Sequence, residues 1–454
     1  MVETLDPTTT TTKLTEPHLE KFEWFEKDAR QPGWVFPLRK AGIARFAEMG
    51  FPTTEEEDWR FTNVLPIARL PFKPVLAPAA AHEVTAEIIA GLTFGKLPAL
   101  RMVFLNGHFV AGLSHRGPLP AGVTLASLAD SLRMNDPALE QHIARYASSE
   151  MSAFTSLNNA FFQDGAFLHI RAGKSIEGPI LLLFLTTGRE TGATSHPRNL
   201  ILLEEASAAT IVESHLSLGQ AATFTNAVTE MVVGPGASIE HTKFQDEDLH
   251  AFHIAALHAE LGAGCNFVSH SFATGAKLSR NNIRAVLGGD GVECLLNGLY
   301  LTRGDQLADH HMVVEHAAPR CNSHEYFNGI LDGRSKGVFH GRILVRPVAQ
   351  KTDAKQTNKN LLLSENATAD TKPQLEIYAD DVKCTHGATI GQLNEESIFY
   401  LRSRGIGTDT ARRMLIHAFA GEIIERIRHP QVREELDKLV WDRLEANPHV
   451  AARE

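Results

Sequence analysis

Cys384 and His386 are the residues of this 454-residue chain whose types and spacing best suit metal chemistry. They lie two positions apart at the end of an apolar-alternating segment, so a β-strand would send both side chains out by the same face. A thiolate and a neutral imidazole are suitable ligands for iron. A closed zinc site needs a second pair of ligands, which Cys-x-His lacks. Taken alone, the spacing therefore favours a buried thiol beside a hydrogen-bonded histidine.

The sequence lacks the common motifs of nucleotide hydrolysis and of hydrolytic catalysis. It contains no Gly-x-x-x-x-Gly-Lys-Ser/Thr loop, no Gly-x-Ser-x-Gly segment and no His-Glu-x-x-His segment. The most conspicuous histidine cluster is Asp309-His310-His311. Because adjacent strand residues point to opposite faces, His310 and His311 are expected to have structural roles rather than to share an ion. These observations predict a protein that is not an enzyme.

Composition limits the compartment and the partners. The formal net charge of −10, with both signs mixed along the chain, argues against a nucleic-acid or anionic-membrane surface. The longest apolar run, Ile180 to Leu185, is far too short to span a bilayer, and the first residues do not resemble a signal peptide. Reduced thiols and a cytoplasmic location are predicted because the four cysteines form no CxxC pair; they are Cys265, Cys294, Cys321 and Cys384.

The regions at the two ends of the chain are predicted to be mostly helical, apart from a short N-terminal tail. Residues 1–13 are polar and threonine-rich, which predicts a disordered tail. Residues 14–165 predict a mostly helical region, in which Thr15 caps the first helix and a short hairpin turns at Asn106-Gly107. Residues 394–454 predict a helical subdomain, with helices beginning near Asn394, Thr408 and Pro430.

Between these regions, residues 166–393 predict strand after strand, because short apolar runs alternate with polar residues and glycine turns. The turns begin near Gly234, Gly262 and Gly288, so by subtraction they are about 26 to 28 residues apart. A β-sandwich would give similar strands, but the recurring spacing favours a solenoid. The predicted fold class is therefore mainly β, with a central parallel or mixed β-helix flanked by helical regions.

Longer motifs around Cys384 and His386 resemble a known family. The segments Gln350-Lys-Thr-Asp-Ala-Lys-Gln-Thr, Asp370-Thr-Lys-Pro-Gln-Leu-Glu-Ile and Phe399-Tyr-Leu-Arg-Ser-Arg-Gly are similar to the C-terminal core of the SufB/SufD family, whose members assemble iron–sulfur clusters. The order Asp-Val-Lys-Cys-x-His-Gly-Ala-Thr resembles the SufD branch of the family. Near the N-terminus, Trp59-Arg60 resembles the family's N-terminal signature, and we interpret it as an aromatic anchor.

The resemblance implies partners and a site. It implies that the β-helix pairs with a SufB-like paralogue near its C-terminal end, which would supply a neighbour for its open strand edges. It also implies that the C-terminal helices receive a SufC-like ABC ATPase. His386 corresponds to the family histidine that faces a SufB cysteine, where a nascent cluster is proposed to form, and Cys384 is the weaker ligand candidate. We expect iron or a cluster there to be transient, with no cofactor held stably by the lone chain.

Alternatives remain open from the sequence. The chain would be a SufB-like primary cluster scaffold if it held the cluster itself. A β-helix carbohydrate-active enzyme would need clustered carboxylates, for which Asp380-Asp381 beside Lys383 is the only suggestive set. A self-associating structural solenoid is the third alternative, and a homodimer of the isolated chain would be compatible with either of the non-enzymatic roles.

Overall fold

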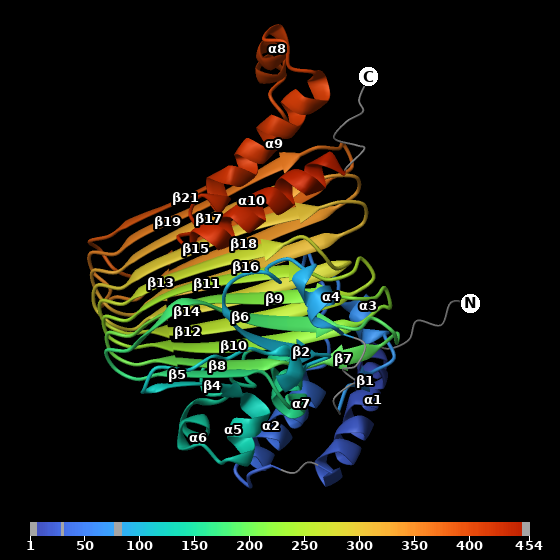
Figure 1. The fold of residues 1–454 in the computed structure, drawn as a ribbon, viewed down its shortest axis with the longest axis vertical. Helices are drawn as coiled ribbons and strands as arrows, with labels where there is room; N and C mark the ends of the chain where they lie inside the picture. Colours follow the sequence, from blue (N-terminus) through green and yellow to red (C-terminus); the bar gives the residue numbers. More distant parts are fainter. Residues whose placement is uncertain (1–6, 29–30, 77–83, 447–454) are drawn as a thin grey trace.

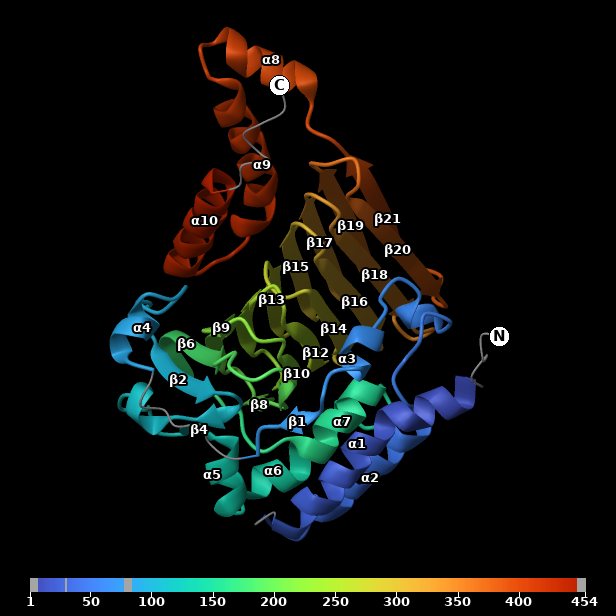
Figure 2. The same ribbon diagram turned by 90° about the vertical axis from the view of Figure 1, so that its right-hand side faces the viewer.

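The computed structural model describes residues 7–28, 31–76 and 84–446, and two long sheets face each other through most of this part of the chain (Figure 1). Each coil of the chain adds one strand to each sheet, so strands alternate between the sheets and neighbouring strands of successive coils are parallel. Two pairs at the first end are antiparallel: Leu100–Leu105 with His108–Phe109, and Val123–Ser127 with Ala166–Ile170. The predicted mainly β fold with a central β-helix is confirmed. Figure 2 shows the strands stacked from the first coils, beside the N-terminal helices, to the end formed by the last strands.

Sheet A contains 11 strands and sheet B contains 10 among the described residues. The strands of sheet A are β1 (Lys73–Pro74), β4 (Val123–Ser127), β5 (Ala166–Ile170), β7 (Ala193–Ser195), β8 (Arg198–Leu203), β10 (Phe224–Val233), β12 (Phe252–Leu261), β14 (Leu278–Leu287), β16 (Leu307–His316), β18 (Lys336–Val345) and β20 (Thr368–Ile377). The strands of sheet B are β2 (Leu100–Leu105), β3 (His108–Phe109), β6 (Ser175–Thr186), β9 (Ala208–Ser217), β11 (Ser238–Asp246), β13 (Asn266–Ala273), β15 (Glu293–Thr302), β17 (Asn322–Leu331), β19 (Asp353–Leu362) and β21 (Lys383–Gly391).

The glycine turns that the spacing predicted join a strand of sheet A to the next strand of sheet B. Gly236 and Gly264 have φ angles of 63° and 61°, the left-handed region that glycine adopts at little cost. The turns stack on the coil before them, since the amide of Gly262 donates to the carbonyl of Val233 at 2.8 Å. The repeat length seen in the sequence is therefore the length of one coil.

Two kinds of side chain fill the space between the sheets. Apolar residues such as Ile239 and Phe267 form a continuous core. Beside this core lies a buried polar group in which the Glu213 carboxylate contacts His215 at 2.8 Å and His241 at 3.3 Å. These ion and hydrogen-bond partners offset the cost of burying the charge.

The helices before the solenoid cover its first coils. They are α1 (Pro7–Asp28), α2 (Val35–Met49), α3 (Leu65–Ala68), α4 (Ala86–Ala90), α5 (Leu128–Arg133), α6 (Pro137–His142) and α7 (Ala153–Phe161), with the 3-10 turns η1 (Glu57–Trp59) and η3 (Ala111–Leu113). Arg198 ties α7 to the sheets, because its buried guanidinium reaches Glu230 at 2.7 Å and Asn158 at 3.0 Å. Buried hydrogen bonds and an ion pair therefore attach helix α7 to the first coils of sheet A.

Two expectations for the N-terminal region are modified by the structure. Thr15 does not cap the first helix, because α1 is assigned from Pro7 and continues past Thr15 and Pro17; the disordered tail expected for residues 1–13 stays a prediction, and residues 1–6 lie outside the described part. The hairpin at Asn106-Gly107 is confirmed, but β2 also pairs with β6. Strands from before residue 166 therefore belong to the solenoid sheets, because they supply neighbours for the first coil.

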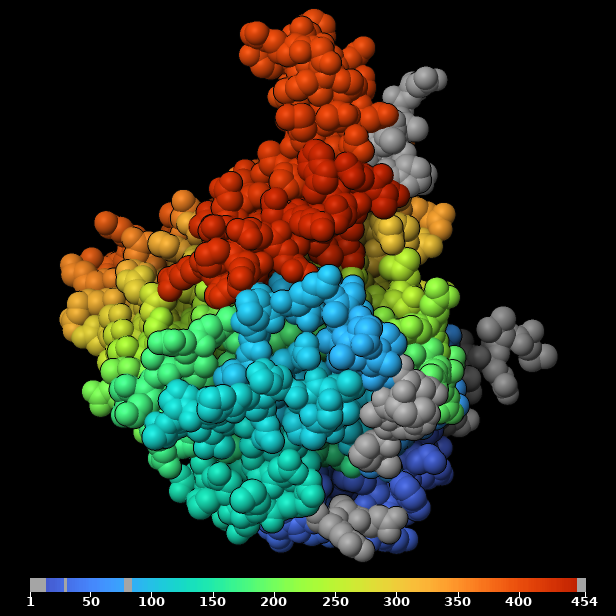
Figure 3. All heavy atoms as spheres, in the orientation of Figure 1, coloured from blue at the N-terminus to red at the C-terminus, as the bar shows by residue number. Residues whose placement is uncertain are grey.

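Three helices follow the last strand: α8 (Glu395–Ser403), α9 (Thr408–Ile424) and α10 (Pro430–Glu445). The Asn394 side chain caps α8 as predicted, whereas α9 begins after Gly407 without a side-chain cap. The helices α9 and α10 lie on the outer face of sheet B, where Asn328 donates to the carbonyl of Phe419 at 2.9 Å. Figure 3 shows both helices covering this face and α8 standing clear of it. The helices do not close the end of the solenoid.

Candidate functional site

The last coil of the solenoid presents two strand edges. In the described part of the chain, β20 has β18 as its neighbour within sheet A, and β21 has β19 as its neighbour within sheet B. Most residues of β21 are exposed, whereas the strands before β20 in sheet A are mainly buried. Exposed apolar side chains lie along the same end, with Ile390 49% and Tyr378 60% exposed. Open edges of this length favour pairing with another chain.

Cys384 and His386 lie on β21 and share one face of it. Cys384 is in register with Ala354, and His386 is in register with Gln356. Both partners on β19 are buried, so the shared face is the one that looks into the space between the sheets. The predicted strand geometry is confirmed: both side chains leave by the same face, at the open end of the interior.

The two candidate ligands differ in their surroundings. Cys384 is half-buried, and burial together with the nearby Asp353 carboxylate raises the pKa of its thiol. The thiol is therefore protonated at neutral pH, which makes it a poor ligand in the lone chain. His386 is exposed. Among the described residues, the groups of three or more suitable side chains within ligand distance do not include either residue.

Polar side chains also occupy the position of His386 in the two preceding coils. Glu325, Gln356 and His386 occupy the same position in successive coils. Gln356 donates to Oε2 of Glu325 at 2.6 Å, while Oε1 of Glu325 has no hydrogen-bond partner. Burial raises the pKa of Glu325 to about 7. Sequence analysis missed this carboxyl, although the coil repeat would have aligned it with His386.

The other three cysteines, Cys265, Cys294 and Cys321, are buried. Burial raises the pKa of Cys265 to about 12 and that of Cys294 well above its usual value. Cys294 occupies the same inward-facing position as Cys384, three coils earlier, in register through Ser323 and Ala354. These thiols are protonated core residues, which leaves Cys384 as the cysteine at the open end.

The suggestive acidic set near β21 does not form an acid/base pair. Asp381 forms an ion pair with Lys351 from the preceding coil, and its backbone amide donates to Oε1 of Gln350 at 2.9 Å. A glycosidase needs two carboxyl groups facing one another across a sugar. The carbohydrate-active alternative gains no support from this arrangement.

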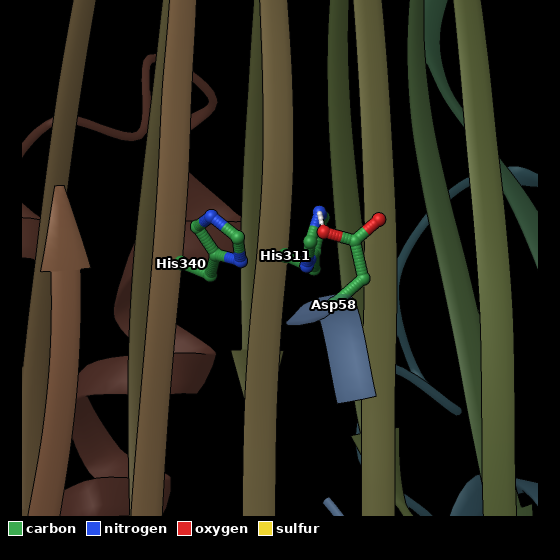
Figure 4. Close-up of side chains that lie close together, drawn as sticks. All are labelled: Asp58, His311 and His340. Carbon is green, nitrogen blue, oxygen red and sulfur yellow. Dashed lines mark ion pairs between the residues drawn. The ribbon is translucent and has the colours of Figure 1, made fainter. Parts of the chain in front are cut away.

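The Asp309-His310-His311 segment divides between the two faces of sheet A. His310 points inward, where it lies 2.9 Å from the Ser271 hydroxyl, and His311 points outward. The prediction that the two histidines point to opposite faces of the sheet is confirmed. The sequence did not reveal that His311 lies beside His340 of the next coil and Asp58 of η1 (Figure 4).

The described helices bear on the membrane prediction. Within residues 7–28, 31–76 and 84–446, no helix combines the length and the apolar character needed to cross a bilayer.

Comparison with known proteins identifies the family. Residues 28–182 match the SufBD protein N-terminal region, and residues 184–419 match the domain described as SUF system FeS cluster assembly, SufBD core domain. A SufBD family iron–sulfur cluster assembly protein of Synechocystis sp. is 33% identical over 400 residues, which cover 86% of this chain and 86% of the relative. The iron–sulfur cluster assembly protein SufD of Escherichia coli is 31% identical over 410 residues, 90% of this chain and 93% of the relative.

A chloroplastic protein of Arabidopsis thaliana, ABCI7, is 31% identical over 410 residues, 88% of this chain and 84% of the relative. The two family matches follow one another along the chain and meet where the solenoid begins, and the relatives align over nearly their whole length. The resemblance inferred from the motifs around Cys384 and His386 is confirmed. The chain belongs to the SufBD family of iron–sulfur cluster assembly proteins.

Proposed function

We propose that this chain is a SufD-like, non-catalytic subunit of an iron–sulfur cluster assembly complex, in which it pairs with a SufB-like paralogue and a SufC-like ABC ATPase. The observation that carries the proposal is the open end of the solenoid, where His386 faces an interior that no other part of the described chain covers. The similarity to proteins named SufD favours this role over that of a SufB-like primary scaffold. The complex would work in the cytoplasm.

The paralogue would add strands to the two open edges. The amide of Lys383 donates to the carbonyl of Thr352, toward β19. Because successive residues of a strand direct their hydrogen-bonding groups to opposite sides, Cys384, His386 and Ala388 direct theirs away from β19. Main-chain pairing there would extend sheet B into the second solenoid and bring partner side chains close to His386.

Iron or a nascent cluster would be the cargo of this interface. His386 supplies one imidazole, and Cys384 supplies a thiol that becomes a ligand only when a bound metal displaces its proton. The remaining ligands would come from the paralogue. Few ligands from each chain suit a cluster that is assembled and passed on.

The ATPase would dock on α8 and the adjoining start of α9. Phe399 is 72% exposed and Tyr400 is 58% exposed, and both lie on the helix that stands clear of the solenoid (Figures 1 and 3). Exposed aromatic residues are common centres of protein interfaces. Only Gln392, Leu393 and Asn394 separate β21 from α8, so movement of the docked helix would be transmitted to the strand that carries His386.

The experiment is co-purification of this chain with its own SufB-like and SufC-like partners, as wild type and as Ala388→Pro. Proline at residue 388 removes an amide that faces the open edge while leaving the hydrogen bonds to β19 intact. We expect the variant to fold, to retain the ATPase and to lose the paralogue. Ala388→Ser, which keeps the amide, is the matched control.

Two results would contradict the proposal. One is a wild-type chain that forms no complex with the paralogue and remains a self-associated solenoid. The other is an Ala388→Pro chain that binds the paralogue as tightly as Ala388→Ser does, because the open edge would then not be the interface.

A further inference from the structure

Two histidines and a carboxylate converge on the outer face of sheet A, on the side facing the N-terminal region. His311 on β16 and His340 on β18 are direct neighbours in register, and Asp58 reaches them from η1. Their ligand atoms all lie within 4.8 Å of one another, and Oδ1 of Asp58 is 3.8 Å from Nε2 of His311. Figure 4 shows the carboxylate directed at His311 and a ring nitrogen of His340 turned toward the same ring.

The two imidazoles are built into the sheet. His311 is 8% exposed and His340 is 6% exposed. Nδ1 of His311 is buried and has no hydrogen-bond partner among the described residues, which is costly for a polar atom unless something binds there. Nε2 of His340 lies 2.8 Å from Oε1 of Gln374. An amide oxygen accepts the N–H of that nitrogen, so the other nitrogen keeps its lone pair, as in ordinary histidine ligands.

The positive charges around the group are each matched by a carboxylate. Arg280 pairs with Asp309 at 2.7 Å and its guanidinium lies 3.7 Å from the centre of the Trp59 ring. The other pairs are Arg342 with Glu376, Lys372 with Glu57, and Arg284 with Glu315. Asp58 remains as the carboxylate beside the two rings, and burial, followed by the neighbouring Arg280, lowers the pKa of His311. Neutral imidazoles next to a carboxylate are the protonation states that bind metal.

We propose that Asp58, His311 and His340 form a binding site for a divalent first-row transition metal, with Fe(II) as the ion relevant to this family. Two histidines and one carboxylate are the ligand set typical of Fe(II) sites with open coordination positions. A cleft of about 270 Å³, lined by Asp58 and His311 as well as Met151 and Arg284, gives room for water or a second ligand at those positions. The site lies on sheet A and is separate from the open end, so it does not depend on the proposed function.

Metal binding requires the ligand atoms of the three residues to move closer together than the 4.8 Å within which they now lie. Ligand atoms around an ion at ordinary metal–nitrogen distances of about 2.0–2.2 Å are roughly 3 Å apart, closer than the present spread. The histidines are fixed on adjacent strands, but the Asp58 side chain is 61% exposed and can rotate toward them. The strands therefore supply two ligands in place, and the carboxylate completes the set.

The test is titration of the purified full-length chain with Co(II), followed by its visible d–d absorption, and then competition with Fe(II) under anaerobic conditions. We expect one Co(II) site whose affinity falls at least about tenfold in Asp58→Asn, in His311→Gln and in His340→Gln. Asp58→Asn is the most informative variant, since its exposed side chain can be changed without disturbing the core. Unchanged circular dichroism and melting temperature would confirm that the variants fold.

Two controls separate this site from other histidines. His250 is an exposed histidine beside a carboxylate, 2.7 Å from Asp248, and His250→Gln should leave Co(II) binding unchanged. His386→Ala should also leave it unchanged. The proposal fails if Asp58→Asn binds Co(II) as the wild type does, or if His386→Ala or His250→Gln removes the absorption bands while the three site variants keep them.

Discussion

At the residue scale, the interior next to His386 buries a carboxyl group, Glu325, that has no ion pair among the described residues. Glu325 is completely buried, and its hydrogen bond in the structure comes from the neutral amide of Gln356. Desolvation disfavours the charged form, which is why the pKa of Glu325 rises to about 7. Glu325 therefore gains or loses its proton close to neutral pH. It is in register with His386, with Gln356 on β19 between them.

This gives a pH-dependent stability that can be measured. The folded state holds the Glu325 proton up to about pH 7, whereas the unfolded chain releases it near its ordinary pKa of 4.5. Because the folded state binds more protons between these values, stability falls as the pH rises from about 4.5 to 7, by something of the order of 3 kcal/mol. We expect Glu325→Gln to unfold at the same urea concentration as wild type near pH 4.5 and at a higher one at pH 8. Parallel pH profiles for the two proteins would contradict this.

At the element scale, the sequence predicted the repeating coils of the solenoid better than it predicted where individual helices begin. The solenoid followed from the stacked turns at Gly234, Gly262 and Gly288, because a glycine turn recurs at the same place in three successive coils. The start of α1 could not be predicted, since polar threonines give no apolar periodicity. The predicted beginning of α9 near Thr408 is confirmed, and its buried face includes Ala411, Ile416 and Ala420.

The sequence predicted the geometry of the Cys384 and His386 site but not that of the second metal-binding group. Cys384 and His386 are close in sequence, so strand alternation alone places them on one face. The Asp58, His311 and His340 group depends on two adjacent coils and on a turn far away in the sequence, and residues so distant give no local pattern. The sequence contained one usable sign, since His311 and His340 lie one coil apart and so fall in register.

The helix α8 gives a prediction at this scale. Replacing Phe399 and Tyr400 by serine removes two exposed aromatic side chains without emptying the core. We expect the double variant to fold normally but to bind the SufC-like ATPase at least about 30-fold more weakly, the size typical of interface hot spots. Leu249→Ser, which alters an exposed apolar residue on a distant turn, is the control. Equal ATPase affinity for both variants would remove α8 from the proposed docking surface.

At the scale of the whole molecule, the solenoid is closed at one end and open at the other. Helices cover the first coils, α9 and α10 cover the outer face of sheet B, and α10 reaches back to the N-terminal region through Glu435, which accepts from the amide of Phe94 at 3.0 Å. The last coil has no such cover in the described chain. A solenoid whose first coils are covered while its last strands are open is suited to extend its sheets into a partner.

The most direct test of this account is the cluster content of the reconstituted complex. The chain is co-expressed with its SufB-like and SufC-like partners as wild type, His386→Ala and the control His324→Ala, an exposed histidine on β17. Each complex is purified anaerobically, and its iron, labile sulfide and cluster absorbance are measured. We expect His386→Ala to form an intact complex that has lost most of its cluster, while His324→Ala keeps it. A full cluster yield in the His386→Ala complex would contradict the account, because the open end would then join the subunits without taking part in assembly.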